Sequence, residues 1–192
     1  MKKFLLIIIP LVIICTGIAF VFAHNNRKEE PNMTLENKKI LVAYFSWSGN
    51  TKSIAEKIHA KTGGDIFRIE PVTPYPKDYN ETAYGIAKEQ KDKNINPPIK
   101  NTDISSYDTI FVGTPAWWYT MAPPVKTFLT DNNFEGKTII PFITHGGGGG
   151  YTIDKDMEKL AKGSIVLAPI IIYGKGNSET DKDIDKWLNS LK

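Results

Sequence analysis

Five short apolar runs recur along the chain, separated by segments with a different spacing of apolar residues. The runs are rich in β-branched residues and lack strict alternation of polar and apolar positions, which is typical of parallel strands covered on both faces. They span Ile40 to Phe45, Ile66 to Ile69, Thr109 to Gly113, Thr138 to Ile143, and Ile165 to Ile172. This pattern predicts five buried parallel strands.

The segments between and after these runs place apolar residues three or four positions apart, as one face of a helix does. These residues are Ile54, Ala55 and Ile58; Tyr79, Ala83, Ile86 and Ala87; Val125, Phe128 and Leu129; Met157, Leu160 and Ala161; and Ile184, Trp187, Leu188 and Leu191. Strand and helix therefore alternate, which indicates an α/β domain with a parallel sheet. Because crossovers between parallel strands are right-handed, we expect helices on both faces of the sheet.

The chain begins with an apolar segment of another kind. Lys2 and Lys3 precede Phe4 to Ala23, which carries no charge over about 20 residues and at about 1.5 Å per residue could cross a bilayer core. We interpret residues 1–23 as a signal peptide or an N-terminal membrane anchor. The long apolar core favours an anchor, whereas Val21 to Ala23 resembles a cleavage site. The predicted location of the rest is extracytoplasmic, either membrane-anchored or secreted.

The remainder divides into a polar linker, residues 24–38, and a segment with the length of one domain, residues 39–192. Without Lys2 and Lys3 the 24 basic residues fall to 22, against 21 acidic residues, so this part is nearly neutral. Its lysines alternate with acidic residues, which argues against nucleic-acid binding. Because Cys15 in the leader is the single cysteine, the domain can form neither a disulfide nor a thiolate metal site. We predict no metal site, and redox chemistry would need a bound organic cofactor.

A hydroxyl-rich turn follows the first predicted strand and opens the first predicted helix. Side-chain hydroxyls, an amide and the free N–H groups of a helix start can converge on one oxyanion, and the helix dipole adds a favourable field. A nucleoside-triphosphate loop would need glycine directly before Lys-Ser or Lys-Thr, whereas Thr51 precedes Lys52 here. The turn therefore predicts a site for a single phosphomonoester, with an ordinary turn or cap as the alternative. Its residues are Ser46, Trp47, Ser48, Gly49, Asn50 and Thr51.

Two further loops would lie at the same edge of the sheet, beyond the carboxyl ends of the strands, where such sheets bind ligands. Three adjacent aromatic residues cannot all enter one core from a loop, so we expect at least one to face a groove and stack on a flat ligand. The alternative is packing on a helix or a partner surface. The glycines of the last loop either allow the main chain to approach a ligand closely or form a flexible link. The histidine before them forms a hydrogen bond either with a ligand ring or with local backbone groups. The two sets are Pro115, Ala116, Trp117, Trp118 and Tyr119, and Thr144, His145, Gly146, Gly147 and Gly148.

These motifs resemble the flavodoxin family, in particular a branch with a Trp-Trp loop. Residues Ser46 to Thr51 match the phosphate-loop pattern Ser/Thr-x-Ser/Thr-Gly-Asn-Thr, and Thr114 to Tyr119 match the Trp-Trp loop. Pro74 to Tyr79 also resembles that branch, and the likeness runs from about Lys39 to Leu191. The resemblance implies a flavodoxin-like three-layer sandwich, an α/β fold with a five-stranded parallel sheet of order 2-1-3-4-5. Flavodoxin with FMN is one of the examples behind the rule that parallel sheets bind ligands beyond the carboxyl ends of their strands. The placement of FMN therefore follows from the resemblance and is not an independent result.

The resemblance also implies a function. Residues 46–51 would hold the phosphate of noncovalent FMN, residues 115–119 would flank its isoalloxazine ring, and residues 144–148 would line the other edge. We expect an exported, membrane-associated electron-transfer flavoprotein whose partner is a redox protein or a membrane quinone. An NAD(P)H-dependent quinone or flavin reductase of the same fold is the alternative, although the sequence offers no second dinucleotide fingerprint. A non-redox binding module is the third possibility.

Overall fold

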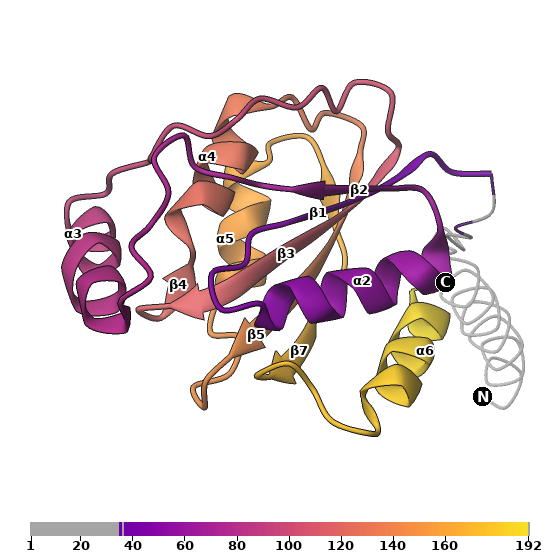
Figure 1. Cartoon of the computed structure of the whole chain (residues 1–192). Helices are drawn as coiled ribbons and strands as arrows, with labels where there is room; N and C mark the ends of the chain where they lie inside the picture. The colour runs from indigo at the N-terminus through magenta and orange to yellow at the C-terminus, as the bar shows by residue number, and fades with distance from the viewer. Residues whose placement is uncertain (1–34, 36, 192) are drawn as a thin grey trace, which may run out of the picture. The chain divides into compact units, whose positions relative to one another are not determined.

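The computed structural model describes Leu35 and residues 37–191, and its central layer is a parallel sheet (Figure 1). The strand order is β2-β1-β3-β5-β6, and β7 also pairs with β5. Because β6 and β7 together take the place of the fifth predicted strand, the predicted order 2-1-3-4-5 is confirmed. The parallel strands are β1 (Ile40–Tyr44), β2 (Asp65–Arg68), β3 (Thr109–Trp117), β5 (Thr138–His145), β6 (Ile165–Val166) and β7 (Ile170–Tyr173).

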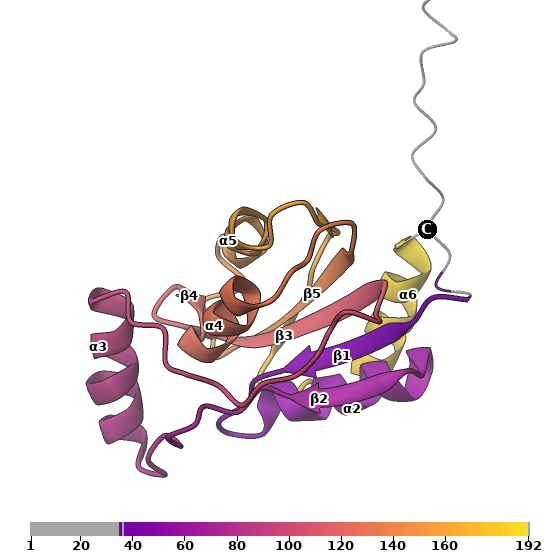
Figure 2. The ribbon, with the colours of Figure 1, turned by 90° about the horizontal axis from the view of Figure 1, so that it is seen from above.

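Helices cover both faces of this sheet, as predicted (Figure 2). The helices α2 and α6 lie on one face, whereas α4 and α5 lie on the other. In both views α3 lies past the carboxyl end of β3, close to the short strand β4. These elements are α2 (Asn50–Thr62), the π-helix η1 (Glu81–Ile86), α3 (Ala87–Asp92), β4 (Thr120–Met121), α4 (Pro123–Asp131), α5 (Ile153–Leu160) and α6 (Thr180–Ser190).

Burial from both sides explains why the central strands lack alternation. Every residue of β1 is buried. On one face of the sheet Leu41 belongs to a buried cluster that includes Phe128 of α4, and α2 and α6 cover the opposite face. On that opposite face the rings of Phe111 and Trp187 meet edge to face, with centroids 5.9 Å apart. The edge strand β7 does alternate between buried and exposed residues, since only one of its faces is covered.

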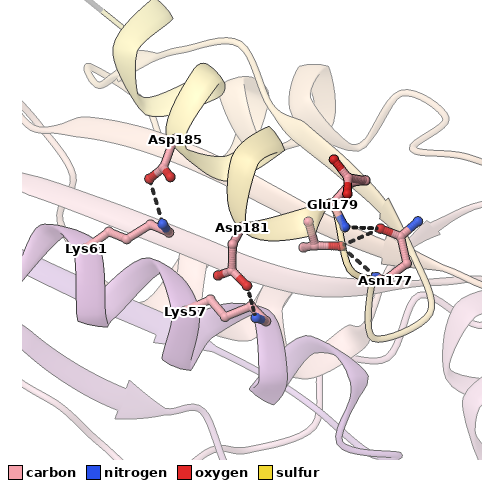
Figure 3. Close-up of polar contacts among 7 residues, drawn as sticks. Lys57, Lys61, Asn177, Glu179, Asp181 and Asp185 are labelled. Atoms are coloured by element: carbon pink, nitrogen blue, oxygen red, sulfur yellow. Dashed lines mark hydrogen bonds and ion pairs between the residues drawn. The ribbon is translucent and has the colours of Figure 1, made fainter.

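Two ion pairs join α2 to α6 (Figure 3). Lys57 Nζ lies 2.5 Å from Asp181 Oδ2, and Lys61 Nζ lies 2.6 Å from Asp185 Oδ1. The hydrogen bond from Lys57 holds the pKa of Asp181 below its ordinary value. This contact is therefore retained at neutral pH and is lost as the pH falls through that lowered pKa. Exposed pairs contribute little to stability, so the buried residues beneath them carry the packing of the two helices.

The last predicted strand, Ile165 to Ile172, is interrupted, so the prediction of one continuous strand is wrong. The N–H of Leu167 still donates to Ile139 O at 2.9 Å. The carbonyl of Ala168 instead accepts the indole N–H of Trp187 at 3.0 Å, and Pro169 has no N–H to donate. The ladder therefore stops after β6 and resumes at β7.

The second predicted helix is present but contains a π-helical turn near its start, after α-helical residues 79–80. The π-helix η1 continues directly into α3, and Tyr79 lies just before it. Spacing rules for α-helices do not predict the wider π-turn, which occurs mostly as an isolated turn and often at functional sites.

The predicted leader, residues 1–23, and most of the predicted linker, residues 24–38, lie outside the described residues. Within the part of the chain that the structure describes, no helix is both long enough and apolar enough to cross a membrane.

Candidate functional site

A groove of about 320 Å³ opens at the carboxyl ends of β1, β3 and β5. Three loops that are distant in the sequence contribute to it, together with η1. Among the described residues that line it there is no carboxylate, lysine or arginine, so the groove suits an uncharged planar group. The lining residues are Trp47, Tyr79, Thr82, Ala83, Tyr84, Ala87, Ala116, Trp117, Trp118, Tyr119, His145, Gly146, Gly148 and Tyr151.

The hydroxyl-rich turn, residues 46–51, lies beside this groove because Trp47 belongs to both. Gly49 adopts φ 92° as the N-cap of α2, and no described side chain caps that helix end. The first N–H groups of α2 are therefore available to an anion. Ser46 is buried and its hydroxyl accepts the N–H of Gly49 at 3.1 Å, whereas Ser48 is exposed.

Thr51 in the first turn of α2 and Thr144 near the end of β5 meet inside the protein. Their hydroxyls form a hydrogen bond of 2.8 Å, and the residues are only 1% and 2% exposed. The pair ties the start of α2 to the end of β5, so it holds the turn and the glycine loop in a fixed relation. Direct contact of either hydroxyl with a ligand stays a prediction.

Replacing Thr144 with valine is expected to lower the free energy of unfolding by about 1–3 kcal/mol, because the buried Thr51 hydroxyl loses its partner. The double variant Thr51→Val with Thr144→Val removes both polar groups and should recover most of that loss. Guanidinium denaturation of the two variants measures the difference. A double variant that is less stable than Thr144→Val would contradict this account.

The strand β3 continues past its predicted end and turns back into β4. Trp117 pairs with Thr120, so Trp118 and Tyr119 are the two central residues of a tight hairpin turn. Their φ values are 48° and 70°, as such a turn requires, although residues with a β-carbon rarely adopt them. Each such residue costs about 1–3 kcal/mol, so the surrounding contacts must hold the turn.

Trp117 turns toward the core. Its ring packs edge-on against Phe45 and Tyr75, with centroid distances of 5.4 and 5.3 Å. Burial raises the pKa of Tyr75 above its ordinary value, and its hydroxyl donates to Gln90 Oε1 at 2.6 Å. Tyr75 therefore stays protonated near neutral pH and serves as a packing residue.

The other two aromatic residues of the hairpin bridge the walls of the groove. Trp118 donates its indole N–H to Ala83 O of η1 at 2.6 Å, which links the hairpin to the π-helix. Tyr119 packs edge-on against Tyr151 after the glycine loop, with ring centroids 5.3 Å apart. The three adjacent aromatics thus contact three different regions, which confirms that they do not enter one core.

His145 organises the glycine loop through its ring. Its Nδ1 accepts the N–H groups of Gly147 and Gly149, each at 3.0 Å, which places the proton of the neutral ring on Nε2. A Cβ on Gly148 would lie 1.5 Å from the Tyr151 hydroxyl, so a larger residue here would displace the Tyr151 ring. The loop is therefore held by its own hydrogen bonds, and His145 has the local role that the sequence left open. A bond from its ring to a ligand stays a prediction.

A family model described as flavodoxin matches residues 39–191. This chain belongs to the flavodoxin family. The match begins just before β1 and ends just after α6, so the predicted membership is confirmed over the whole described domain.

Solved structures resemble this flavodoxin-family chain over most of its length. A candidate flavoprotein from Bacteroides eggerthii DSM 20697 is 30% identical, with 81% of this chain and 98% of that chain covered at a TM-score of 0.69. Another candidate flavoprotein, from Bacteroides uniformis ATCC 8492, is 28% identical. The match covers 78% of this chain and 98% of that chain, with a TM-score of 0.67. A flavoprotein from Lactobacillus acidophilus NCFM, solved in complex with FMN, is also 28% identical. The match covers 78% of this chain and 98% of that chain, with a TM-score of 0.61.

Sequence reasoning missed several residues that line this flavodoxin-family groove. Tyr79 was predicted as part of the second helix and of the family resemblance but not as a site residue, and Tyr84 was in neither prediction. They are 58% and 59% exposed, and two tyrosines on a helical segment beside a predicted ligand edge were a usable signal. The other missed lining residues are Thr82, Ala83, Ala87 and Tyr151. Predicted residues that do not line the groove are Ser46, Ser48, Gly49, Asn50, Thr51, Pro115, Thr144 and Gly147.

Proposed function

We propose that this chain binds FMN noncovalently and acts as an electron carrier. One juxtaposition supports the proposal most: the hydroxyl-rich turn with its uncapped helix start and the uncharged aromatic groove lie at the same edge of the sheet, with Trp47 in both. FMN combines a phosphomonoester with a flat ring, and the two surfaces suit those two parts. The FMN complex of the related Lactobacillus acidophilus flavoprotein adds support.

The residues present fit this cofactor. Residues 46–51 would hold the phosphate, while residues 115–119 and 144–148 would flank the ring. A Cβ built on Gly146, Gly147 or Gly149 would meet no atom within 4 Å, so there is room beside the main chain of this loop. The N–H groups at the start of α2 offer donors to an anion without any need for a lysine.

When bound, FMN supplies the electron chemistry, and the protein supplies binding, orientation and electrostatics. The turn fixes the position of the phosphate, and the aromatic walls exclude water from the ring. His145 keeps the main chain of the glycine loop in one conformation through its two hydrogen bonds. The described residues that line the groove include no carboxylate and no lysine. The lining side chains would therefore act by positioning the flavin ring.

The absorption spectrum of the purified chain tests the proposal. We expect a yellow protein whose released cofactor is FMN by mass spectrometry, and whose flavin is not rapidly bleached by NADH or NADPH in a stopped-flow instrument. Rapid bleaching would instead support the NAD(P)H-dependent quinone or flavin reductase. A colourless protein that does not respond to added FMN would support a non-redox binding module.

We also propose that residues 1–23 export the domain, so that its partner is a redox protein or a membrane quinone outside the cytoplasm. The support is the uncharged stretch Phe4 to Ala23 behind Lys2 and Lys3. Protease added to intact cells should degrade the domain, or the domain should be found in the medium. Protection from protease in intact cells, with full accessibility after lysis, would contradict export.

A further inference from the structure

A second groove, of about 510 Å³, lies between the hydroxyl-rich turn and the segment that follows β2. Trp47 belongs to both grooves and separates them. The groove proposed above to hold the flavin ring, called the flavin groove, lies toward the hairpin and the glycine loop. The second groove has Ser46, Trp47 and Ser48 of the turn on one side and residues 68–77 and Lys100 on the other. Its chemistry differs from that of the flavin groove, because charged side chains form part of its lining.

Hydrogen bonds hold opposite walls of this second groove in place. The indole Nε1 of Trp47 donates to Pro76 O at 2.9 Å, which joins the turn to the segment after β2. The N–H of Lys100 donates to Glu70 O at 2.8 Å, which joins a second chain segment to the end of β2. The walls are therefore fixed before any ligand arrives, which lowers the entropy cost of binding.

The charged lining has an excess of two positive charges, because Arg68, Lys77 and Lys100 face one carboxylate, that of Glu70. Glu70 lies 2.7 Å from Lys100 and 3.8 Å from Arg68, and the hydrogen bond from Lys100 holds the pKa of Glu70 below its ordinary value. Arg68 also donates to Ser46 O at 3.1 Å. Lys77 makes no ion pair with any described residue, so its charge is available to a ligand.

Most of the rest of the lining is apolar, and Ser46 and Ser48 of the hydroxyl-rich turn add two hydroxyl groups. Pro74, Tyr75 and Pro76 contribute rings, and Val72 is 57% exposed within the same segment. A flat apolar surface with a cationic rim is suited to a planar ring that carries a phosphate or carboxylate. We propose that this groove binds a small aromatic anion on the other side of Trp47 from the flavin ring, at a site that borders the turn proposed for the FMN phosphate and shares Ser46 and Ser48 with it. The anion could be a free metabolite or the phosphorylated end of a larger molecule such as NADPH.

The test uses the FMN-saturated full chain, so that the hydroxyl-rich turn is already filled, and phenyl phosphate as the probe. Isothermal titration calorimetry at low salt should give saturable binding that weakens as salt is added. Phenol should not bind, because it lacks the charge, and the amount of bound FMN should not change. Benzoate in place of phenyl phosphate tells whether a carboxylate suffices. If the ligand is the phosphorylated end of a dinucleotide, NADPH should bind more tightly than phenyl phosphate.

Three variants assign the binding to this groove. Lys77→Gln should weaken phenyl phosphate binding about tenfold without changing the unfolding midpoint, because Lys77 is exposed and forms no ion pair with a described residue. Glu70→Gln should tighten binding about tenfold, because it removes the opposing charge and releases Lys100 and Arg68. Lys155→Gln on α5, outside both grooves, is the matched control and should leave binding unchanged.

A merely structural role for these side chains would not produce tighter binding in Glu70→Gln. Absence of binding to the FMN-saturated chain would overturn the proposal. Displacement of FMN by phenyl phosphate would also overturn it, because the anion would then occupy the hydroxyl-rich turn. If the chain binds no FMN but binds phenyl phosphate with the expected variant pattern, the proposed function fails while this site stands.

Discussion

The substitution Ser48→Asp is expected to weaken FMN binding about a hundredfold and to leave riboflavin binding unchanged. Ser48 is exposed in the turn next to the uncapped start of α2. Two unit charges about 6 Å apart repel by about 3 kcal/mol at an effective dielectric constant near 20, and the phosphate of FMN carries up to about two charges. Riboflavin has the same ring without the phosphate, so the new carboxylate has nothing to repel.

Quenching of flavin fluorescence in titrations of the apoprotein measures both affinities. Ser48→Asn, which is neutral and similar in size to aspartate, is the matched control and should bind FMN within a few-fold of the natural chain. A carboxylate near the start of α2 complements the helix dipole, so Ser48→Asp should not lower the unfolding midpoint. Equal weakening of FMN and riboflavin would contradict the assignment of the phosphate to this turn.

The second large effect is expected from Gly113→Ala in the centre of the sheet, which should lower the free energy of unfolding by about 3 kcal/mol. Gly113 of β3 pairs with Phe142 of β5, and a Cβ at Gly113 would lie 2.1 Å from the Phe142 ring. Phe142 is fully buried, so its ring cannot move aside without displacing the residues around it. Overpacking of this kind forces side chains out of their preferred rotamers.

Chemical denaturation measures this loss of stability as a lower midpoint concentration of denaturant. The slope of the unfolding free energy against denaturant concentration should stay unchanged. The added substitution Phe142→Leu makes room and should restore part of the stability of Gly113→Ala. Gly146→Ala is the matched control, because its Cβ would enter open space and its φ is not in the left-handed region. If Gly113→Ala were as stable as Gly146→Ala, the close approach of Phe142 would not be a constraint.

Much of the fold was predictable because it depends on local pattern. The run from Ile40 to Phe45 predicted β1 to within one residue at its end, since a strand buried on both faces must be apolar throughout. Strand and helix alternation then required a parallel sheet with helices on both faces. The carboxyl ends of parallel strands share one edge, so the meeting of the turn, the Trp-Trp loop and the glycine loop followed from the strand order.

Other features depend on hydrogen bonds between residues far apart in the chain, which no local pattern encodes. The Thr51 and Thr144 hydroxyls meet across 93 positions, and the Trp118 indole finds Ala83 O in η1 across 35. Arg68 donates to the main chain of the turn at Ser46 O, across 22 positions, a contact that the turn motif does not predict. Each contact exists only after the sheet has brought its partners together.

The amino-acid order was therefore sufficient for the class of fold, the family and the edge of the sheet where a ligand would bind, because burial and turn chemistry act over a few residues. Long-range packing settled the rest: the two-residue turn at Trp118 and Tyr119, the break in the last strand at Pro169, and the division of the ligand edge by Trp47 into an uncharged and a cationic groove. These features arise where side chains from separate segments compete for the same space and the same hydrogen-bond partners. Such competition can be resolved only in three dimensions.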